Sequence, residues 1–200
     1  MTKAKSTEEL VTELQSRLFT TSALKEVSSI LEEISQNKTF KLHVNAIMSD
    51  NTLTDPQKRR QLSYVLKIIE DPILQEFFDD LLAHNEFWLF TSGKIDYFDK
   101  FVQSFQMATE EIELIYLVSA IELDPGFLRN IAEDLSRSFG YKVLIKHEVN
   151  PAIIGGIQLR VENLVFDLSI RTKFQQFQRA WLASLDKTEN QIGRNQPETV

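Results

Sequence analysis

Apolar residues recur at every third or fourth position through the first half of the chain, and this spacing predicts amphipathic helices. Ser6 and Glu9 form a capping-box pattern before the first helix, because each side chain can accept a hydrogen bond from the backbone amide of the other residue. Ser22 is the expected N-cap of the second helix. The apolar positions of the first three helices are Leu10, Leu14, Leu18, Leu24, Val27, Leu31, Ile34, Phe40, Val44, Ile47 and Met48.

Three further helices follow a polar break over residues 51–56. Pro56 suits a first helical turn, where its missing amide hydrogen would have no partner, and Asp71-Pro72 ends one helix and begins the next. A last helix of this half begins after Gly93. Their apolar positions are Leu62, Val65, Leu66, Ile69, Ile73, Leu74, Phe77, Phe78, Leu81, Leu82, Ile95, Phe98, Phe101, Val102 and Phe105. Six such helices joined by short breaks are typical of a helical bundle.

The pattern changes near residue 110. Residues 112–118 favour a strand and are apolar on both faces, which indicates a central strand. Pro125 opens a helix that ends at Gly140, a suitable C-terminal cap, and residues 141–149 form a second strand. The expected apolar face of that helix consists of Leu128, Ile131, Leu135 and Phe139.

The remaining elements are a hairpin and a helix. Ile157, Leu159 and Val161 alternate with polar residues, Glu162-Asn163 can form a two-residue turn, and residues 164–168 return antiparallel. Ser169 can cap a final helix. Its apolar face is Ile170, Phe174, Phe177, Trp181 and Leu185.

We therefore expect an α+β fold in three parts. Residues 1–107 form an N-terminal six-helix bundle, and residues 108–186 form a small α/β C-terminal domain with a short mixed sheet and two helices. Residues 187–200 are a polar, flexible tail.

Charge is unevenly distributed along the chain. Residues 1–140 carry 14 Lys and Arg against 23 Asp and Glu, a net of −9, whereas residues 141–187 carry 7 against 4, a net of +3. This asymmetry indicates either two regions with different partners or uneven solvation alone. The net charge of the whole chain, −7, is a poor match for nucleic-acid phosphates.

No residue pattern indicates a catalytic, cofactor-binding or metal site. The chain has no cysteine, which excludes disulfides, thiolate nucleophiles and cysteine zinc sites. His43, His84 and His147 lack ligand spacing, so each is better interpreted as a surface or core residue. Gly155-Gly156 precedes a strand and no Lys-Ser/Thr follows, so it is not a phosphate loop.

No apolar run approaches the roughly 18–20 residues that a membrane span requires. The N-terminus also lacks the apolar core of a signal peptide. We therefore expect that the chain reaches a membrane only through another protein.

The segment from Asn150 to Phe174 resembles the C-terminal signature of the delta subunit of F-type ATP synthase, called OSCP in mitochondria. That signature has two apolar residues, a small-Gly pair, a hairpin and an Asp-x-Ser-x-Arg motif before the last helix. Its structural residues in this chain are Gly155, Gly156, Asp167, Ser169 and Arg171. The glycines can adopt positive φ or allow close backbone approach, and the Asp-x-Ser pair can bond amides at the helix start.

The resemblance extends over about residues 10–185 and includes a Val-x-Ser-Ala-x-x-Leu pattern beginning at Val118. Leu168 stands where the family usually has Gly, and the family's Arg after Asn85 is absent. The first-helix pattern of the family is also barely visible here. The contacts of the helical half with partners therefore cannot be carried over residue by residue.

The resemblance implies a non-catalytic stator subunit that resists rotor torque during proton-driven ATP synthesis. It implies that the N-terminal bundle binds the alpha subunits of the catalytic head, and that the C-terminal domain binds the stalk b subunit. No nucleic acid, cofactor or membrane span is expected. The implied location is the cytoplasmic face of the bacterial inner membrane, rather than an organellar inner membrane. The alternative is an unrelated soluble helical adaptor.

Two sets of residues are candidates for these contacts. One set offers more apolar surface than a small bundle easily buries, and we expect it to contribute to the alpha-subunit site: Phe77, Phe78, Leu81 and Phe87. The other is basic and is expected to make binding of the b subunit sensitive to salt: Lys142, Lys146, Arg171, Lys173 and Arg179.

Overall fold

A computed structural model describes residues 4–91, 96–161 and 164–179. The chain packs as two compact units. The first, here called the helical unit, comprises Met1–Leu114 and Leu128–Leu144, and the second, the sheet unit, comprises Ile115–Phe127 and Ile145–Val200. The expected division into folding domains at residues 107 and 186 stays a prediction.

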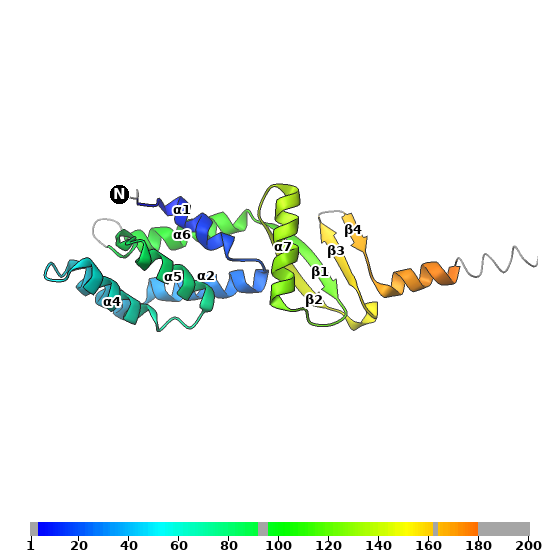
Figure 1. The fold of residues 1–200 in the computed structure, drawn as a ribbon, viewed down its shortest axis with the longest axis horizontal. Coiled ribbons are helices and arrows are strands. Elements are labelled where there is room, and N and C mark those ends of the chain that lie inside the picture. The colour runs from blue at the N-terminus through cyan, green and yellow to red at the C-terminus, as the bar shows by residue number, and fades with distance from the viewer. Residues whose placement is uncertain (1–3, 92–95, 162–163, 180–200) are drawn as a thin grey trace, which may run out of the picture. The chain divides into compact units, whose positions relative to one another are not determined.

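Helices precede the first strand throughout, and the fold is α+β (Figure 1). The helical elements are α1 (Thr7–Ser16), α2 (Thr21–Gln36), α3 (Lys38–Ser49), α4 (Asp55–Leu66), α5 (Pro72–Ala83), the 3-10 helix η1 (Phe87–Phe90), α6 (Tyr97–Glu110), α7 (Pro125–Phe139) and the 3-10 helix η2 (Pro151–Ile153). Helix α6 packs against α1 and α2, while α4 packs against α3 and α5. None of the helices in the described residues is long and apolar enough to cross a membrane.

Most of the expected helix caps are present. Ser6 and Glu9 form the predicted capping box, and the Asp71 carboxylate accepts a hydrogen bond from the Leu74 amide at 2.8 Å at the start of α5. The prediction for α2 was wrong. Its N-cap is Thr20, whose hydroxyl accepts a hydrogen bond from the Ala23 amide at 3.2 Å. Thr20 has an extended backbone, as an N-cap requires, whereas Ser22 lies inside the helix.

Aromatic side chains form the centre of the helical core. The rings of Phe77 and Phe101 stack with centroids 5.7 Å apart. The ring centroids of Phe78 and Phe90 are 6.0 Å apart. Four residues that we expected to supply exposed binding surface are buried in this core: Phe77, Phe78, Leu81 and Phe87. That expectation was wrong because α4, η1 and α6 together provide enough apolar surface to cover α5.

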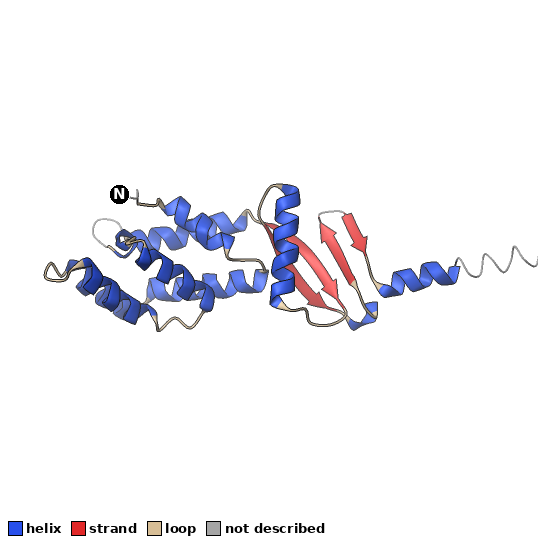
Figure 2. Ribbon diagram, viewed as in Figure 1, coloured by secondary structure: helices blue, strands red, loops and turns tan. Residues whose placement is uncertain are grey.

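The sheet has four strands in the order β2-β1-β3-β4. The strands are β1 (Glu113–Ser119), β2 (Val143–Val149), β3 (Ile157–Val161) and β4 (Leu164–Asp167). The arrows of β1 and β2 point in the same direction, and α7 connects them in sequence (Figure 2). Strand β3 pairs antiparallel with both β1 and β4. The sheet is therefore mixed.

Strand β1 is central, as expected, but only one of its faces is buried. Ile115 and Leu117 are fully buried, whereas Tyr116 on the other face is partly exposed. Lys146 and Arg160 lie over the Tyr116 ring at 5.0 and 5.9 Å from its centroid. Long cationic side chains therefore cover this face in part, and their stems and charges both suit an aromatic ring.

The end of the described chain is a hairpin followed by a helix. Val161 pairs with Leu164 across the hairpin, and the predicted turn residues 162–163 lie outside the described residues. Residues 170–179 are helical. The expected contributions of Trp181 and Leu185, and the polar tail, also lie outside the described residues.

Candidate interaction surfaces

A groove of about 1080 Å³ lies on the helical unit between α2, α3 and the segment that joins α4 to α5. Its apolar lining includes Ile30, Ile34, Phe40, Val65 and Ile69. Two large apolar side chains that line it, Tyr64 and Ile68, are 80% and 79% exposed. A concave apolar surface of this kind can accept an amphipathic helix.

Acidic residues outnumber basic ones around this groove. Glu26, Glu33 and Glu70 line it, against Lys67 and the histidine His43. The groove therefore favours a ligand that combines apolar with basic side chains.

The sequence interpretation missed this groove. Its available signal was the spacing of Tyr64 and Ile68, two apolar residues four positions apart that fall outside the predicted buried stripe of this segment; Tyr64 lies on α4 and Ile68 in the turn that follows it. Apolar residues at this spacing that lie outside the buried stripe indicate a second, exposed apolar surface.

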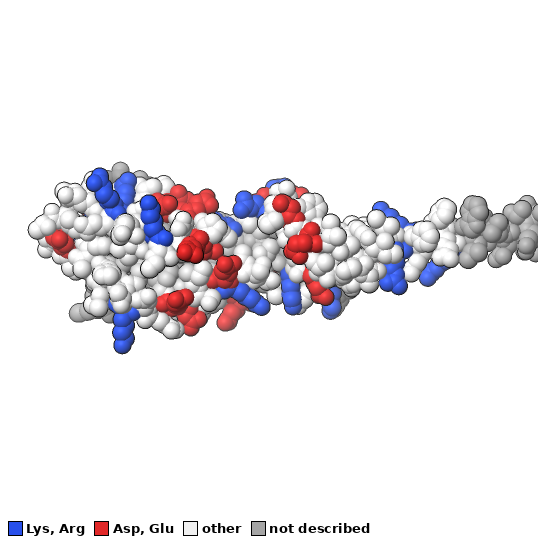
Figure 3. Space-filling view, turned by 90° about the horizontal axis from the view of Figure 1, so that it is seen from below, with Lys and Arg blue, Asp and Glu red and all other residues white. Residues whose placement is uncertain are grey.

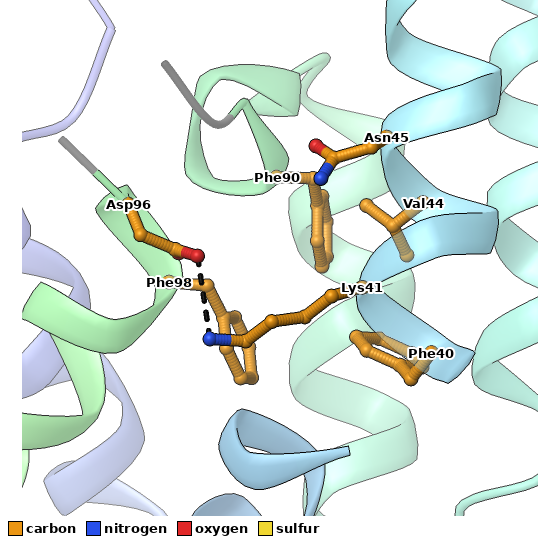
Figure 4. Close-up of a pocket in the computed structure, with 7 residues that line it drawn as sticks. All are labelled: Phe40, Lys41, Val44, Asn45, Phe90, Asp96 and Phe98. Atoms are coloured by element: carbon orange, nitrogen blue, oxygen red, sulfur yellow. Dashed lines mark ion pairs between the residues drawn. The ribbon is translucent and has the colours of Figure 1, made fainter. Parts of the chain in front are cut away.

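A second, much smaller cavity of about 20 Å³ lies between α3 and the start of α6 (Figure 4). The Lys41 ammonium crosses it to reach Asp96 at 3.3 Å, and it also bonds Asp99 at 2.6 Å. Burial opposes ionisation of both partners. Hydrogen bonds and charge outweigh this effect, so the pKa of Lys41 is raised, and that of Asp99 is lowered with help from the Ser35 hydroxyl. Because the Lys41 ammonium is already paired with two carboxylates and the cavity has room for about one water, this cavity serves packing rather than ligand binding.

In the sheet unit, the signature glycines lie where two backbone segments approach closely. Gly156 has φ +80°, and a Cβ there would overlap the carbonyl oxygen of Leu168. A Cβ on Gly155 would lie 2.7 Å from Cδ1 of Ile170. The Ile170 amide donates to the Gly155 carbonyl at 2.8 Å, so this approach is stabilised by a backbone hydrogen bond. Leu168 itself does not have positive φ, so its backbone does not require the family's usual Gly.

The polar signature residues bond the start of the last helix. Asp167 accepts hydrogen bonds from the Ser169 amide at 2.9 Å and the Thr172 hydroxyl at 2.6 Å, and these bonds lower the pKa of its carboxyl to about 2. The Ser169 hydroxyl accepts from the Thr172 amide at 3.3 Å. Arg171 donates to the Ala152 carbonyl at 3.3 Å. All five signature residues therefore lie at one junction between the 150–156 loop, the hairpin and the helix.

Beyond this junction the chain exposes a set of apolar side chains, here called the apolar patch. Each of its members is at least half exposed: Leu164, Val165, Phe166, Leu168, Ile170 and Phe174. Residues 168–179 contain Arg171, Lys173 and Arg179 and neither Asp nor Glu. The visible face of this helix shows basic side chains and no acidic ones (Figure 3). The patch therefore favours an apolar partner with acidic flanks.

One side-chain cluster has the composition of a hydrolytic triad, and the sequence interpretation missed it because its members are far apart in the chain. The Ser119 hydroxyl lies 2.7 Å from Nε2 of His147, and Nδ1 of that histidine is 3.4 Å from Glu122. However, the hydroxyl donates its proton to the Ile121 carbonyl at 2.5 Å. His147 must then donate to Ser119, which is the reverse of what a general base requires. Ser119 is also buried, so this cluster ties strand ends together.

The other histidines are isolated from it. His43 lines the groove, and Nδ1 of His84 is 2.7 Å from the Asp80 carbonyl. Within the described ranges, no group of three or more His, Cys, Asp or Glu residues could hold a metal ion.

Comparison with known proteins identifies relatives over most of the chain. The family model for the ATP synthase delta (OSCP) subunit matches residues 14–181. ATP synthase subunit delta of Ligilactobacillus salivarius is 29% identical over 175 residues, which cover 87% of this chain and 90% of that protein. The subunit delta of Pelagibacter ubique is 29% identical over 154 residues, covering 76% and 77%. A chain of the Toxoplasma gondii mitochondrial ATP synthase hexamer is 14% identical, with coverage of 81% and 87% and a TM-score of 0.33.

The family match includes the signature junction, the groove-lining helices and both strands of the hairpin. The chain therefore belongs to the ATP synthase delta (OSCP) family, whose members are non-catalytic peripheral-stalk subunits of F-type ATP synthase.

Proposed function

We propose that this chain connects the catalytic head of F-type ATP synthase to its stalk, with the alpha subunits bound by the helical bundle of residues 1–107 and the b subunit by the domain of residues 108–186. The observation that carries this proposal is the presence of two exposed apolar surfaces of opposite charge. The groove has an acidic rim, and the apolar patch has basic flanks. Two chemically different surfaces suit two different partners.

The role is mechanical. Rotation of the rotor drives conformational change in the head only if the head is held against the torque. A connector therefore needs two firm attachments and a rigid body between them. The packed aromatic core and the Lys41 ion pairs with Asp96 and Asp99 suit a part that must resist deformation.

The groove replaces the buried aromatic residues as the proposed site for the N-terminal helix of an alpha subunit. The apolar face of that helix would contact Ile34, Phe40 and Ile69, and basic residues beside it would face Glu26 and Glu33. Because apolar burial supplies most of the free energy, raising the salt from low to moderate concentration should weaken this contact little.

The signature residues serve structure in this proposal. Gly155 and Gly156 allow the 150–156 loop to approach the helix start, while Asp167, Ser169 and Arg171 fix the helix to the hairpin and loop. The helix direction, and with it the placement of the apolar patch, depends on this junction. The b subunit would therefore bind a surface of fixed geometry, with a stronger salt dependence than the groove shows.

We place the chain at the cytoplasmic face of a bacterial membrane, where it is held peripherally through the complex. The relatives from Ligilactobacillus and Pelagibacter support a bacterial rather than an organellar enzyme.

Calorimetric titration of the full chain with a peptide of the alpha-subunit N-terminus tests the groove. Ile68→Asp should weaken binding about tenfold or more, because it places a charge in the apolar contact. Leu42→Asp is the matched control, since Leu42 is also highly exposed but does not line the groove. Equal affinities of the wild-type chain and the Ile68 variant would exclude the groove as the site. Absence of binding by the wild-type chain would contradict the proposed function.

A further inference from the structure

Ile154 has a backbone conformation that its side chain disfavours. Its φ is +68° and its ψ is −36°. In the part of the chain that the structure describes, Asn85 is the one other non-glycine residue with positive φ. Asn tolerates this region because its short side chain can bond locally, whereas a β-branched residue at positive φ is a genuine outlier. The folded chain therefore carries strain at Ile154.

The isolated chain gains little from having isoleucine there. The Ile154 side chain is 71% exposed, whereas the preceding Ile153 is buried. Glycine would permit the same turn without strain, and little buried apolar surface would be lost. Backbone strain at an exposed isoleucine indicates that its side chain serves to contact a binding partner.

The position of Ile154 connects it to the apolar patch. It precedes Gly155, over which Cδ1 of Ile170 lies, and the Gly155 carbonyl accepts a hydrogen bond from the Ile170 amide at 2.8 Å. Arg171 bonds the same loop through the Ala152 carbonyl. Ile154 is therefore held beside the start of the C-terminal helix, where Ile170 and Phe174, four positions apart, share one face.

We propose that Ile154 is a principal contact residue for a partner helix that lies along Ile170 and Phe174, and that this partner carries acidic residues beside its apolar stripe. The acidic flank follows from charge complementarity, since residues 168–179 contain Arg171, Lys173 and Arg179 and no acidic residue. This inference rests on the proposed function, in which the sheet unit holds the b subunit.

The conformation of the Ile154 backbone positions this residue for binding before the partner arrives. The loop is fixed by hydrogen bonds from Ile170 and Arg171, so the Ile154 side chain is presented to the partner before binding. A side chain ordered in advance loses less conformational entropy when the complex forms. The strain thus lowers the stability of the free chain, and the fixed position of the loop favours the complex.

The test compares stability with binding in the full chain, with the soluble C-terminal half of the b subunit as the probe. Ile154→Gly should weaken binding about tenfold or more. Its melting temperature should be unchanged or higher by roughly 2–4 °C, because strain is relieved. Ile154→Ala should weaken binding without raising the melting temperature, since a Cβ remains at positive φ. Leu42→Ala is the control for loss of exposed apolar surface, since Leu42 is 70% exposed on α3, and it should change neither measurement.

The outcomes separate this inference from the proposed function. If the wild-type chain does not bind the b-subunit probe, the proposed function fails. If wild type and Ile154→Gly bind equally, the role of Ile154 is overturned while the proposed function stands. A marked fall in the melting temperature of Ile154→Gly would also overturn it, because the residue would then be structural. A probe whose acidic residues are replaced by their amides should bind more weakly, and equal binding would overturn the acidic flank.

Discussion

The two units of the chain place similar apolar residues in opposite environments. Phe77 and Phe101 of the helical unit are fully buried and stack on each other, whereas Phe166 and Phe174 of the sheet unit are at least half exposed. The helices that carry Phe77, Phe101 and Phe174 show the same apolar periodicity in the sequence. The spacing therefore identifies which face of an element is apolar, but the number of neighbouring elements decides whether that face is covered.

The units also differ in how their exposed apolar surfaces are charged. The charged residues that line the groove of the helical unit are mostly acidic, whereas the last described helix carries only basic charges. A partner that suits one surface is electrostatically mismatched to the other. The two surfaces therefore differ in charge as well as in their elements, as the proposed attachment to two different partners requires.

The largest effect is expected from truncating a core aromatic residue. Phe77→Ala should lower the free energy of unfolding by about 3–5 kcal/mol, since it leaves a cavity among buried rings. Phe174→Ala is the matched control and should change it by less than about 0.5 kcal/mol. Urea denaturation measures both. Similar losses would show that the two aromatic residues are equally buried, and the contrast between the units would fail.

Two glycines with positive φ differ in whether an added Cβ would clash with neighbouring backbone. Comparing them separates the energetic cost of positive φ from the cost of the close approach. Gly156→Ala should cost about 2–4 kcal/mol of stability, because positive φ and overlap with the Leu168 carbonyl act together. Gly140→Ala should cost only about 1–2 kcal/mol, since Gly140 has a similar φ of +78° but a Cβ there would meet no other atom within 4 Å. Thermal or urea unfolding gives the difference. Equal costs would mean that the loop and the C-terminal helix do not constrain each other.

Removing a helix cap should change the free energy of unfolding by less than the substitutions above, and the caps of α5 and of the last helix can be compared. Asp71→Ala should destabilise the chain by about 1 kcal/mol, because the buried carboxylate bonds the Leu74 amide and α5 contributes much of the core. Ser169→Ala should cost less than Asp71→Ala, since the helix that it caps is largely exposed. Asp71→Asn retains an accepting oxygen and serves as the rescue variant. A larger loss for Ser169 would show that the C-terminal helix is more important to folding than its exposure indicates.

The smallest effect concerns acid stability. Hydrogen bonds from Thr172 and Ser169 hold the pKa of Asp167 at about 2, below its ordinary value of 3.8. The ionised group therefore contributes to stability above about pH 4, and this contribution is lost as the pH falls toward 2. Asp167→Asn cannot titrate at this position, so the difference between the wild-type and variant denaturation midpoints should shrink as the pH falls from about 4 toward 2. Carboxyl NMR of the wild-type chain should show Asp167 titrating near pH 2, and an ordinary titration would contradict the bonded geometry.

Local sequence signals predicted the elements well where short-range chemistry decides them. The capping box of Ser6 and Glu9, the cap at Asp71 and the helix end at Gly140 depend on residues within one turn. Ser22 was predicted in place of Thr20 because several adjacent hydroxyl residues can cap, and only the backbone conformation distinguishes them. The pairing of Ser119 with His147 was missed because nothing local relates residues on two different strands.

The sequence by itself determined the order and type of the elements, the family and the lack of any pattern for catalysis. These depend on periodicity, on caps and on a run of signature residues, all of which are local in the chain. Tertiary structure alone decided that the aromatic residues of α5 are covered, that Tyr64 and Ile68 are not, and that Ile154 stands strained beside the C-terminal helix. Coverage and close approach are relations between segments distant in sequence. They depend on how the elements pack, because burial is set by neighbouring elements and not by the residue itself.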